Sequence, residues 1–210
     1  MFYKTSEPHG LPHNPLNALV APRPIGWIST IDAQGRFNLA PYSFFNAVAY
    51  HPPQVMFSSL GCKDTVRNIQ ETGQFVVNLA TYALREQMNA TSVAAPHGVS
   101  EFEYAGLKAA ASRIVKPPRV AESPVHLECE LAQIVELTAD SGHESNFVVF
   151  GKVLGVEIAD WAIVDGLVDT AKLQPLARLG YDQYCYVKEV FSLPRPEWTG
   201  ERQSPSGPSH

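Results

Sequence analysis

Residues 58–65 read Ser-Ser-Leu-Gly-Cys-Lys-Asp-Thr and combine short hydroxyl side chains, a glycine and a lysine. The pattern predicts a strand that leads into a helix capped by Asp64. The free N–H groups at a helix start favour an anion, and the lysine adds a positive charge. We therefore predict a phosphate site in which Lys63 supplies the charge and Thr65 and Asn68 face the ligand. An ordinary capped helix beside a solvated lysine would show the same spacing.

A second segment, residues 40–47, reads Ala-Pro-Tyr-Ser-Phe-Phe-Asn-Ala and carries no formal charge. It mixes flat aromatic surface with a few short hydrogen-bonding side chains, which is the lining that a planar heteroaromatic ligand needs. Two adjacent phenylalanines are also typical of a barrel core. Taken together, the two segments predict an aromatic ring bound next to a phosphate.

Other chemistries find little support in the sequence. No histidine pair has the H-x-x-x-H or H-E-x-x-H spacing of a metal site, although a two-ligand site at His126 and Glu128 is an alternative to a solvated sheet face. Neither a G-x-S-x-G elbow nor a G-x-G-x-x-G loop after a strand is present, so a nicotinamide cofactor would have to dock transiently on another surface. The three cysteines are far apart, which predicts buried, reduced thiols without a disulfide or zinc.

The elements that must position these segments are short strands separated by turns. Residues 25–31 and the strand that follows Arg36 predict a hairpin, joined by the type I turn Asp32 to Gly35. About seven strands with a few helices predict a mainly β (α+β) antiparallel barrel with helical appendages. The further predicted elements are strand Gln54–Ser58, a helix from Asp64 to Thr72 ended by Gly73, strand Gln74–Ala80, a helix over 82–91 capped by Thr81, a helical excursion to about Pro118, and strands Val125–Leu131, Asn146–Ile158 (bulged at Gly151 or Gly155) and Tyr181–Lys188.

Length and charge limit the classes of protein that fit. The 210 residues suffice for one domain, predicted over 1–191, followed by a flexible Ser/Pro/Gly-rich tail over 192–210. The net charge of −5 argues against a nucleic-acid partner. The uncharged stretch Asn38–Cys62 contains prolines and polar side chains that exclude a membrane helix. The first residues lack the apolar region of a signal peptide, so we expect a cytoplasmic protein.

Several motifs together resemble the flavin reductase-like family of FMN-binding split barrels, flavoredoxin branch. The resemblance extends over about residues 10–190 in the order of the family. The matching runs are PRPIGWIST (22–30), NLAPYSFFN (38–46), KDT (63–65) with Asn68-Ile69, TGQFVVNL (72–79), MNATS (88–92), PRVAESP (118–124) and RLG (178–180).

The resemblance implies a Greek-key split barrel that forms a homodimer and binds one FMN per subunit near the dimer interface. It also implies roles for matched positions. The flavin ring and ribityl chain would be lined by Ser43, Phe44, Phe45 and Asn46, the phosphate would be held by Ser58, Ser59, Lys63, Thr65 and Asn68, and Arg178 would contact the flavin. The sequence departs from the family at Tyr181 and Asp182, where relatives often continue with glycine.

The expected activity is an FMN-dependent oxidoreductase that uses NADH or NADPH and passes electrons to free flavin, a small acceptor, or an oxygenase or redox partner. Because flavin carries the redox chemistry, no obligatory acid or base is expected. His97 lies on the helical excursion and is a candidate substrate-side contact, with an ordinary loop histidine as the alternative. An FMN-binding electron carrier without NAD(P)H turnover is the second hypothesis. A split barrel for haem, pyridoxal phosphate or no ligand is the third.

Overall fold

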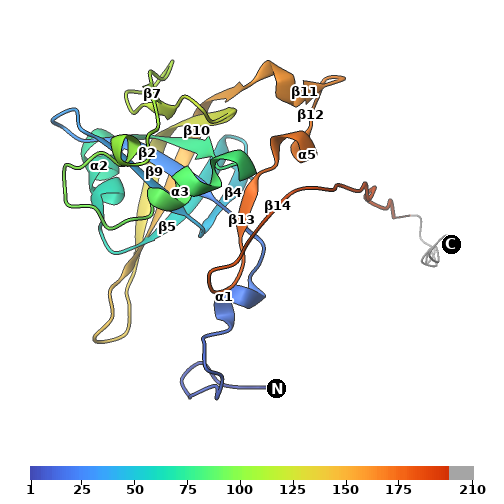
Figure 1. Cartoon of the computed structure of the whole chain (residues 1–210). Coiled ribbons are helices and arrows are strands. Elements are labelled where there is room, and N and C mark those ends of the chain that lie inside the picture. The colour runs from blue at the N-terminus through green and yellow to red at the C-terminus, as the bar shows by residue number, and fades with distance from the viewer. Residues whose placement is uncertain (199–210) are drawn as a thin grey trace.

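The computed structural model describes residues 1–198 and is built around one seven-stranded antiparallel sheet, in the order β3-β2-β6-β9-β10-β5-β4 (Figure 1). Strand β3 also contacts β5, so the two ends of the sheet approach each other. These features confirm the expected mainly β split barrel. The seven strands are β2 Gly26–Ile31, β3 Phe37–Tyr42, β4 Phe45–Tyr50, β5 Pro53–Leu60, β6 Gln74–Leu79, β9 Val125–Leu137 and β10 Asn146–Ile158.

Short helices and three small sheets surround the barrel. The helices are α1 Leu16–Leu19, α2 Asp64–Thr72, the 3-10 turn Tyr82–Leu84, α3 Arg85–Ala90, α4 Glu101–Tyr104, the 3-10 turn Asp160–Ala162 and α5 Thr170–Leu173. In the first small sheet, β13 Leu176–Arg178 lies between β1 Arg23–Pro24 and β14 Tyr184–Tyr186. The other two pair β7 Ala109–Ala110 with β8 Arg119–Val120 and β11 Ile163–Val164 with β12 Leu167–Val168. The β11–β12 hairpin and the last described residues lie away from the barrel (Figure 1).

The β2–β3 hairpin forms for the local reason that the sequence indicates. The Asp32 carboxylate accepts hydrogen bonds from the backbone N–H groups of Gln34 and Arg36 at 2.9 and 2.8 Å. Gly35 has a φ of 84°, a left-handed conformation that glycine adopts without a steric cost. The turn therefore fixes the register that brings Asn38 and Pro41 to the site described below.

The long strands β9 and β10 carry the barrel wall, and their pairing is interrupted twice. The register shifts fall between Phe150 and Gly151 and between Val153 and Gly155, as the glycines predict. A Cβ at Gly151 would lie 2.2 Å from the buried Phe75 ring, so only glycine lets β10 pass this part of the core. The bulges thus bend the wall around a close-packed interior.

The polar face predicted for β9 is buried, which corrects the expectation of a solvated sheet face. His126 and Glu128 are 2% and 3% exposed beneath the segment 109–120. Both carboxylate oxygens of Glu128 accept backbone N–H groups of that segment, and His126 Nε2 donates to the Val120 carbonyl at 2.9 Å. His126 and Glu128 therefore attach this loop to the sheet. The Glu128 oxygens accept backbone N–H groups, which argues against a metal site at this pair.

Three other expectations also need correction. Cys62 is exposed and only Cys129 is buried, where burial raises the pKa of its thiol to about 12. The helix predicted over 82–91 is a 3-10 turn followed by α3, and Thr81 makes no side-chain cap bond. The last strand spans Tyr184–Tyr186 alone, because Tyr181 has a φ of 57° and turns the chain before it.

Two absences hold for the part of the chain that the structure describes. Within residues 1–198 no helix is long and apolar enough to cross a membrane, and no group of three or more His, Cys, Asp or Glu side chains has the geometry to hold a metal ion. Of the predicted tail over 192–210, residues 199–210 lie outside the described residues.

Candidate functional site

The first residues of α2 line a cavity of about 340 Å³ at the edge of the barrel. Lys63 is the N-cap residue of α2 and is exposed, and no side chain caps the first turn of this nine-residue helix. Thr65 lies two residues further on and is buried, with its Oγ1 accepting a hydrogen bond from Asn38 Nδ2 at 2.9 Å and its hydroxyl also in contact with the buried Tyr42 phenol. The cavity therefore offers a lysine and free helix N–H groups, which are donors that suit a phosphate, with the Thr65 side chain in its wall.

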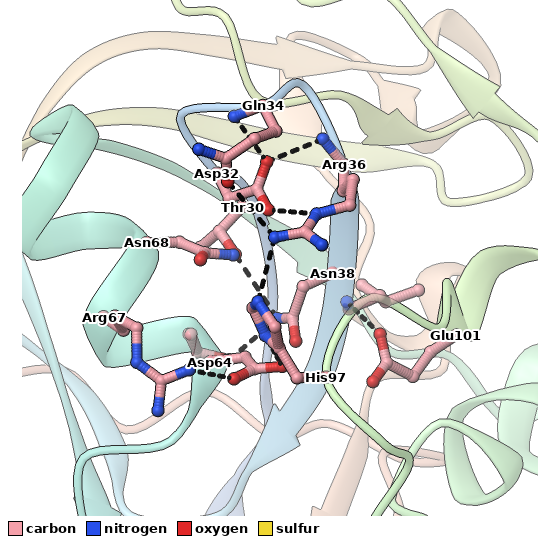
Figure 2. A network of polar contacts seen from close by, with 12 residues as sticks. Thr30, Asp32, Gln34, Arg36, Asn38, Asp64, Arg67, Asn68, His97 and Glu101 are labelled. Atoms are coloured by element: carbon pink, nitrogen blue, oxygen red, sulfur yellow. Dashed lines mark hydrogen bonds and ion pairs between the residues drawn. The ribbon is translucent and has the colours of Figure 1, made fainter.

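Asp64 does not cap α2, which corrects the sequence prediction, since the N-cap is Lys63. Its carboxylate turns instead to Arg67 Nη1 at 2.7 Å and to His97 Nδ1 at 3.0 Å (Figure 2). The Arg67 guanidinium thus offsets the negative charge that would otherwise repel a phosphate in the cavity, and the His97 N–H orients the carboxylate away from it. The interaction explains how an aspartate can stand between Lys63 and Thr65.

His97 connects three segments that are distant in the sequence, as Figure 2 shows. Its Nε2 lies 2.9 Å from Arg36 Nη2. Because a guanidinium only donates, Nε2 is the acceptor, and Nδ1 carries the proton that is donated to Asp64. The histidine thereby fixes the loop over 91–100, which covers one side of the cavity, to the β2–β3 hairpin and to α2.

The residues predicted to line the flavin ring, Ser43 to Asn46, lie in different environments. Ser43 lines a second cavity of about 560 Å³, and the Phe44 ring is exposed beside the Arg23 guanidinium, whose Cζ lies 5.8 Å from the ring centroid. Phe45 packs against the barrel core and over Gly26. Asn46 is exposed on β4, where its side-chain oxygen accepts from the Ala47 N–H.

The remaining predicted phosphate residues, Ser58, Ser59 and Asn68, do not line the Lys63 cavity. Ser58 and Ser59 are neighbours on β5 and so point to opposite faces of the sheet. Ser59 is fully buried and its hydroxyl donates to the Gly61 carbonyl at 3.0 Å. Asn68 is buried below the cavity wall, where it donates to Thr30 Oγ1 at 3.0 Å. The structure thus brings Lys63 and Thr65 into one cavity wall and places Ser59 and Asn68 behind it.

The two cavities are neighbours, because Pro41 and Ser92 line both of them. Arg178 lines the second cavity together with Arg23, whereas Lys63 lines only the first. The uncharged segment around Pro41 therefore runs between a lysine on one side and a pair of arginines on the other.

Sequence reasoning missed two charged residues of this region. Arg23 belongs to the PRPIGWIST run (22–30), but the sequence predicts no role for it. Its position between Pro22 and Pro24 is the one local feature that sets it apart. Glu101 is buried at the Lys63 cavity, where its carboxylate accepts the Leu39 N–H at 3.0 Å and burial raises its pKa. No sequence pattern predicts that α4 lies beside the cavity. This position depends on the tertiary contact between α4 and β3, whose residues Glu101 and Leu39 are 62 positions apart in the chain.

Comparison with known proteins gives a consistent result. Residues 19–172 match the Flavin reductase like domain. An uncharacterised protein of Halalkalibacterium halodurans is 37% identical over 190 residues, covering 88% of this chain and 90% of that protein.

Two solved structures share the fold and a substantial part of the sequence. The nitrilotriacetate monooxygenase component B from Bacillus cereus is 31% identical with a TM-score of 0.80, over 85% of this chain and 90% of that one. The Pseudomonas fluorescens 2-nitrobenzoate 2-nitroreductase is 30% identical with a TM-score of 0.78, over 86% and 88% of the two chains.

Proposed function

Because the chain belongs to the flavin reductase like domain family, we propose that it is an FMN-dependent oxidoreductase that takes electrons from NADH or NADPH. The electrons pass on to free flavin, a small acceptor or a partner protein. One observation carries this proposal: a lysine at an uncapped helix start lines a cavity that adjoins a second, larger cavity along an uncharged wall. A ligand with a phosphate at one end and a planar polar ring at the other suits such a pair of cavities.

The residues present fit the cofactor at its phosphate end. Lys63 and the first N–H groups of α2 are donors, and the charge of Asp64 is paired with Arg67 while its second oxygen accepts the His97 Nδ1–H. Ser58, Ser59 and Asn68 stay part of the proposed phosphate site, with Ser59 bonded to the Gly61 carbonyl and Asn68 to Thr30. The ring and ribityl chain would lie along the segment that contains Ser43, Phe44, Phe45 and Asn46, with Arg178 at the far end.

FMN would supply the redox chemistry by accepting a hydride and passing electrons on. The protein chain itself would bind the cofactor, orient its ring and shield it from water. Lys63 and Thr65 hold the phosphate, and the segment around Pro41 supplies an apolar wall for the ring. His97, fixed between Arg36 and Asp64, keeps the 91–100 loop over the cavity and so limits the access of water. We propose this positioning role for His97 in addition to the expected contact with the substrate, since His97 also lines the cavity.

The names of the two solved relatives support a broad range of electron acceptors. One is a component of a monooxygenase, and the other is a nitroreductase of a small aromatic acid. Both kinds of acceptor, a partner protein and a small organic molecule, are compatible with a flavin that is reached through an open cavity.

The visible spectrum and rapid mixing test the proposal. The purified protein should carry or take up FMN, and stopped-flow mixing with NADH or NADPH should bleach the flavin absorbance. Flavin that stays oxidised with both donors would favour the electron-carrier hypothesis instead. A colourless protein that takes up no FMN would contradict both, and would leave a different ligand, or none, for the barrel.

We expect a homodimer, with strand β4 in the interface. Strand β4 is the edge of the barrel sheet, and all its residues after Phe45 are exposed, including Val48 and Tyr50 at 45% and 87%. An exposed apolar edge strand is a surface that proteins normally cover. Sedimentation equilibrium should therefore give twice the 23.0 kDa chain mass, and Val48→Glu should shift the protein toward one chain mass. A wild-type monomer with full FMN affinity would contradict the interface.

A further inference from the structure

Two arginines face each other across the small sheet beside the barrel. Arg23 of β1 and Arg178 of β13 are Cα partners in an antiparallel pair, so their side chains leave the sheet on the same face. Both line the cavity of about 560 Å³. Like charges directly opposite each other destabilise a sheet. The pair therefore does not stabilise the fold, and a role in binding would explain it.

Backbone contacts hold both guanidinium groups but leave donors unused. Arg23 is 8% exposed and donates to the carbonyls of Asn17, Val20 and Leu179, while its buried Nε has no hydrogen-bond partner. Arg178 donates to the Tyr184 hydroxyl and to the Tyr181 carbonyl. The backbone contacts orient the two groups without neutralising either charge.

Little negative charge offsets this pair. Among the described residues that line the cavity, Asp182 is the one carboxylate, and it is fully exposed and 3.4 Å from Arg178 Nη2. The other polar lining groups are neutral amides and hydroxyls, those of Asn14, Asn17, Asn89, Ser43 and Ser92 among them. Burial, and next to it the charge of Arg178, lower the pKa of Arg23, which is the effect of a cation that lacks an anion.

We infer that the Arg23–Arg178 cavity binds an oxyanion, phosphate or carboxylate, of a second ligand that reaches the flavin from the side opposite Lys63. The assignment to a second ligand rests on the proposed function, which gives the phosphate of FMN to the Lys63 cavity. An oxyanion would offset the positive charge of the two arginines and accept short, charge-assisted hydrogen bonds from their free N–H groups. The ligand is then an anionic electron donor, such as a phosphate-bearing dinucleotide, or a carboxylate-bearing acceptor.

The test measures oxyanion binding directly, by isothermal titration of the FMN-loaded protein. Inorganic pyrophosphate represents a phosphate-bearing donor, and benzoate represents a carboxylate-bearing acceptor. Arg178→Gln should weaken binding of the probe by a factor of roughly 10 to 100, since one charge-assisted hydrogen-bonding group is lost. Asp182→Asn, at a fully exposed position, should strengthen the same binding. Both variants should keep the circular dichroism spectrum of the wild type.

Arg85→Gln is the matched control. Arg85 lines a neighbouring cavity of about 420 Å³, which Arg178 also lines, but Arg85 packs over the Tyr82 ring, at 4.3 Å, and does not line the Arg23–Arg178 cavity. This control should bind the probes like the wild type. A loss as large as that of Arg178→Gln would mean that overall charge, or the cavity that Arg85 and Arg178 share, attracts the anion, and would overturn the inference.

The remaining outcomes separate this inference from the proposed function. Binding of pyrophosphate alone identifies a phosphate-bearing ligand, and binding of benzoate identifies a carboxylate; either supports the site. The absence of binding by both probes overturns it. Release of FMN in proportion to bound probe also overturns it, because the cavity would then be the cofactor's own phosphate site. A protein that takes up no flavin refutes the proposed function, yet Arg178-dependent binding of a probe to that protein would still establish the oxyanion site.

Discussion

Replacing Lys63 with alanine should weaken FMN binding by roughly 1.5–3 kcal/mol, which is about a ten- to hundredfold rise in the dissociation constant. The lysine is the one cationic side chain at the start of α2 whose charge no carboxylate partner engages in the part of the chain that is described. Arg67, one turn later, is paired with Asp64. Because Lys63 is exposed and caps α2 through its backbone alone, its removal should leave the fold intact.

Fluorescence titration of the flavin-free protein measures this effect, with FMN and riboflavin compared side by side. Riboflavin lacks the phosphate, so Lys63→Ala should change its affinity little. Lys116→Ala is a suitable control, since Lys116 is also exposed and lines none of the cavities described above. Equal losses for FMN and riboflavin would place the phosphate elsewhere, and an unchanged FMN affinity would reject the Lys63 cavity as its site.

Replacing Glu128 with alanine should lower the free energy of unfolding by about 2–4 kcal/mol. The carboxylate accepts the backbone N–H groups of Arg113, Ile114 and Val115 at 2.8, 2.6 and 3.0 Å. Without it these donors lose their acceptor, and the segment 109–120 loses its attachment to β9. Urea denaturation followed by circular dichroism gives the difference.

Glu130→Ala is the matched control for this prediction. Glu130 lies two residues along the same strand and pairs with Lys152 at 2.9 Å, with both side chains 44% exposed. An exposed pair of this kind contributes at most about 1 kcal/mol. Similar losses in both variants would show that Glu128 has no special structural role.

The contribution of Glu128 should also depend on pH. Although burial acts to raise its pKa, the three backbone N–H groups outweigh burial and hold the pKa below its ordinary value of about 4.5. A lowered folded-state pKa stabilises the protein above the unfolded-state pKa, and this stability disappears as the pH falls through the folded-state pKa. The stability difference between wild type and Glu128→Gln should therefore shrink below about pH 4.5. A difference that stays constant into acid would contradict this account.

The features that the sequence alone predicts are the local ones. The Asp32 to Gly35 turn, the start of α2 near Lys63 and the bulges at Gly151 and Gly155 depend on neighbouring residues, whose turn chemistry and alternation are visible in any short window. The first residues of the uncharged stretch Asn38–Cys62 line the two cavities, and Pro41 lines both of them. The family resemblance adds the cofactor, which no local pattern identifies alone.

Contacts between distant segments are decided only by the tertiary structure. The alternation in β9 predicts a polar face, but not the segment that buries His126 and Glu128. The Asp64–His97–Arg36 contact joins a helix, a loop and a hairpin, and the Arg23–Arg178 pair depends on the register between two strands at opposite ends of the domain. Register and burial are set by the packing of the whole chain, because each strand can pair in several ways that local sequence permits and the core selects one. The sequence thus determined which residues could bind a phosphate, and the fold determined which charges stand around it.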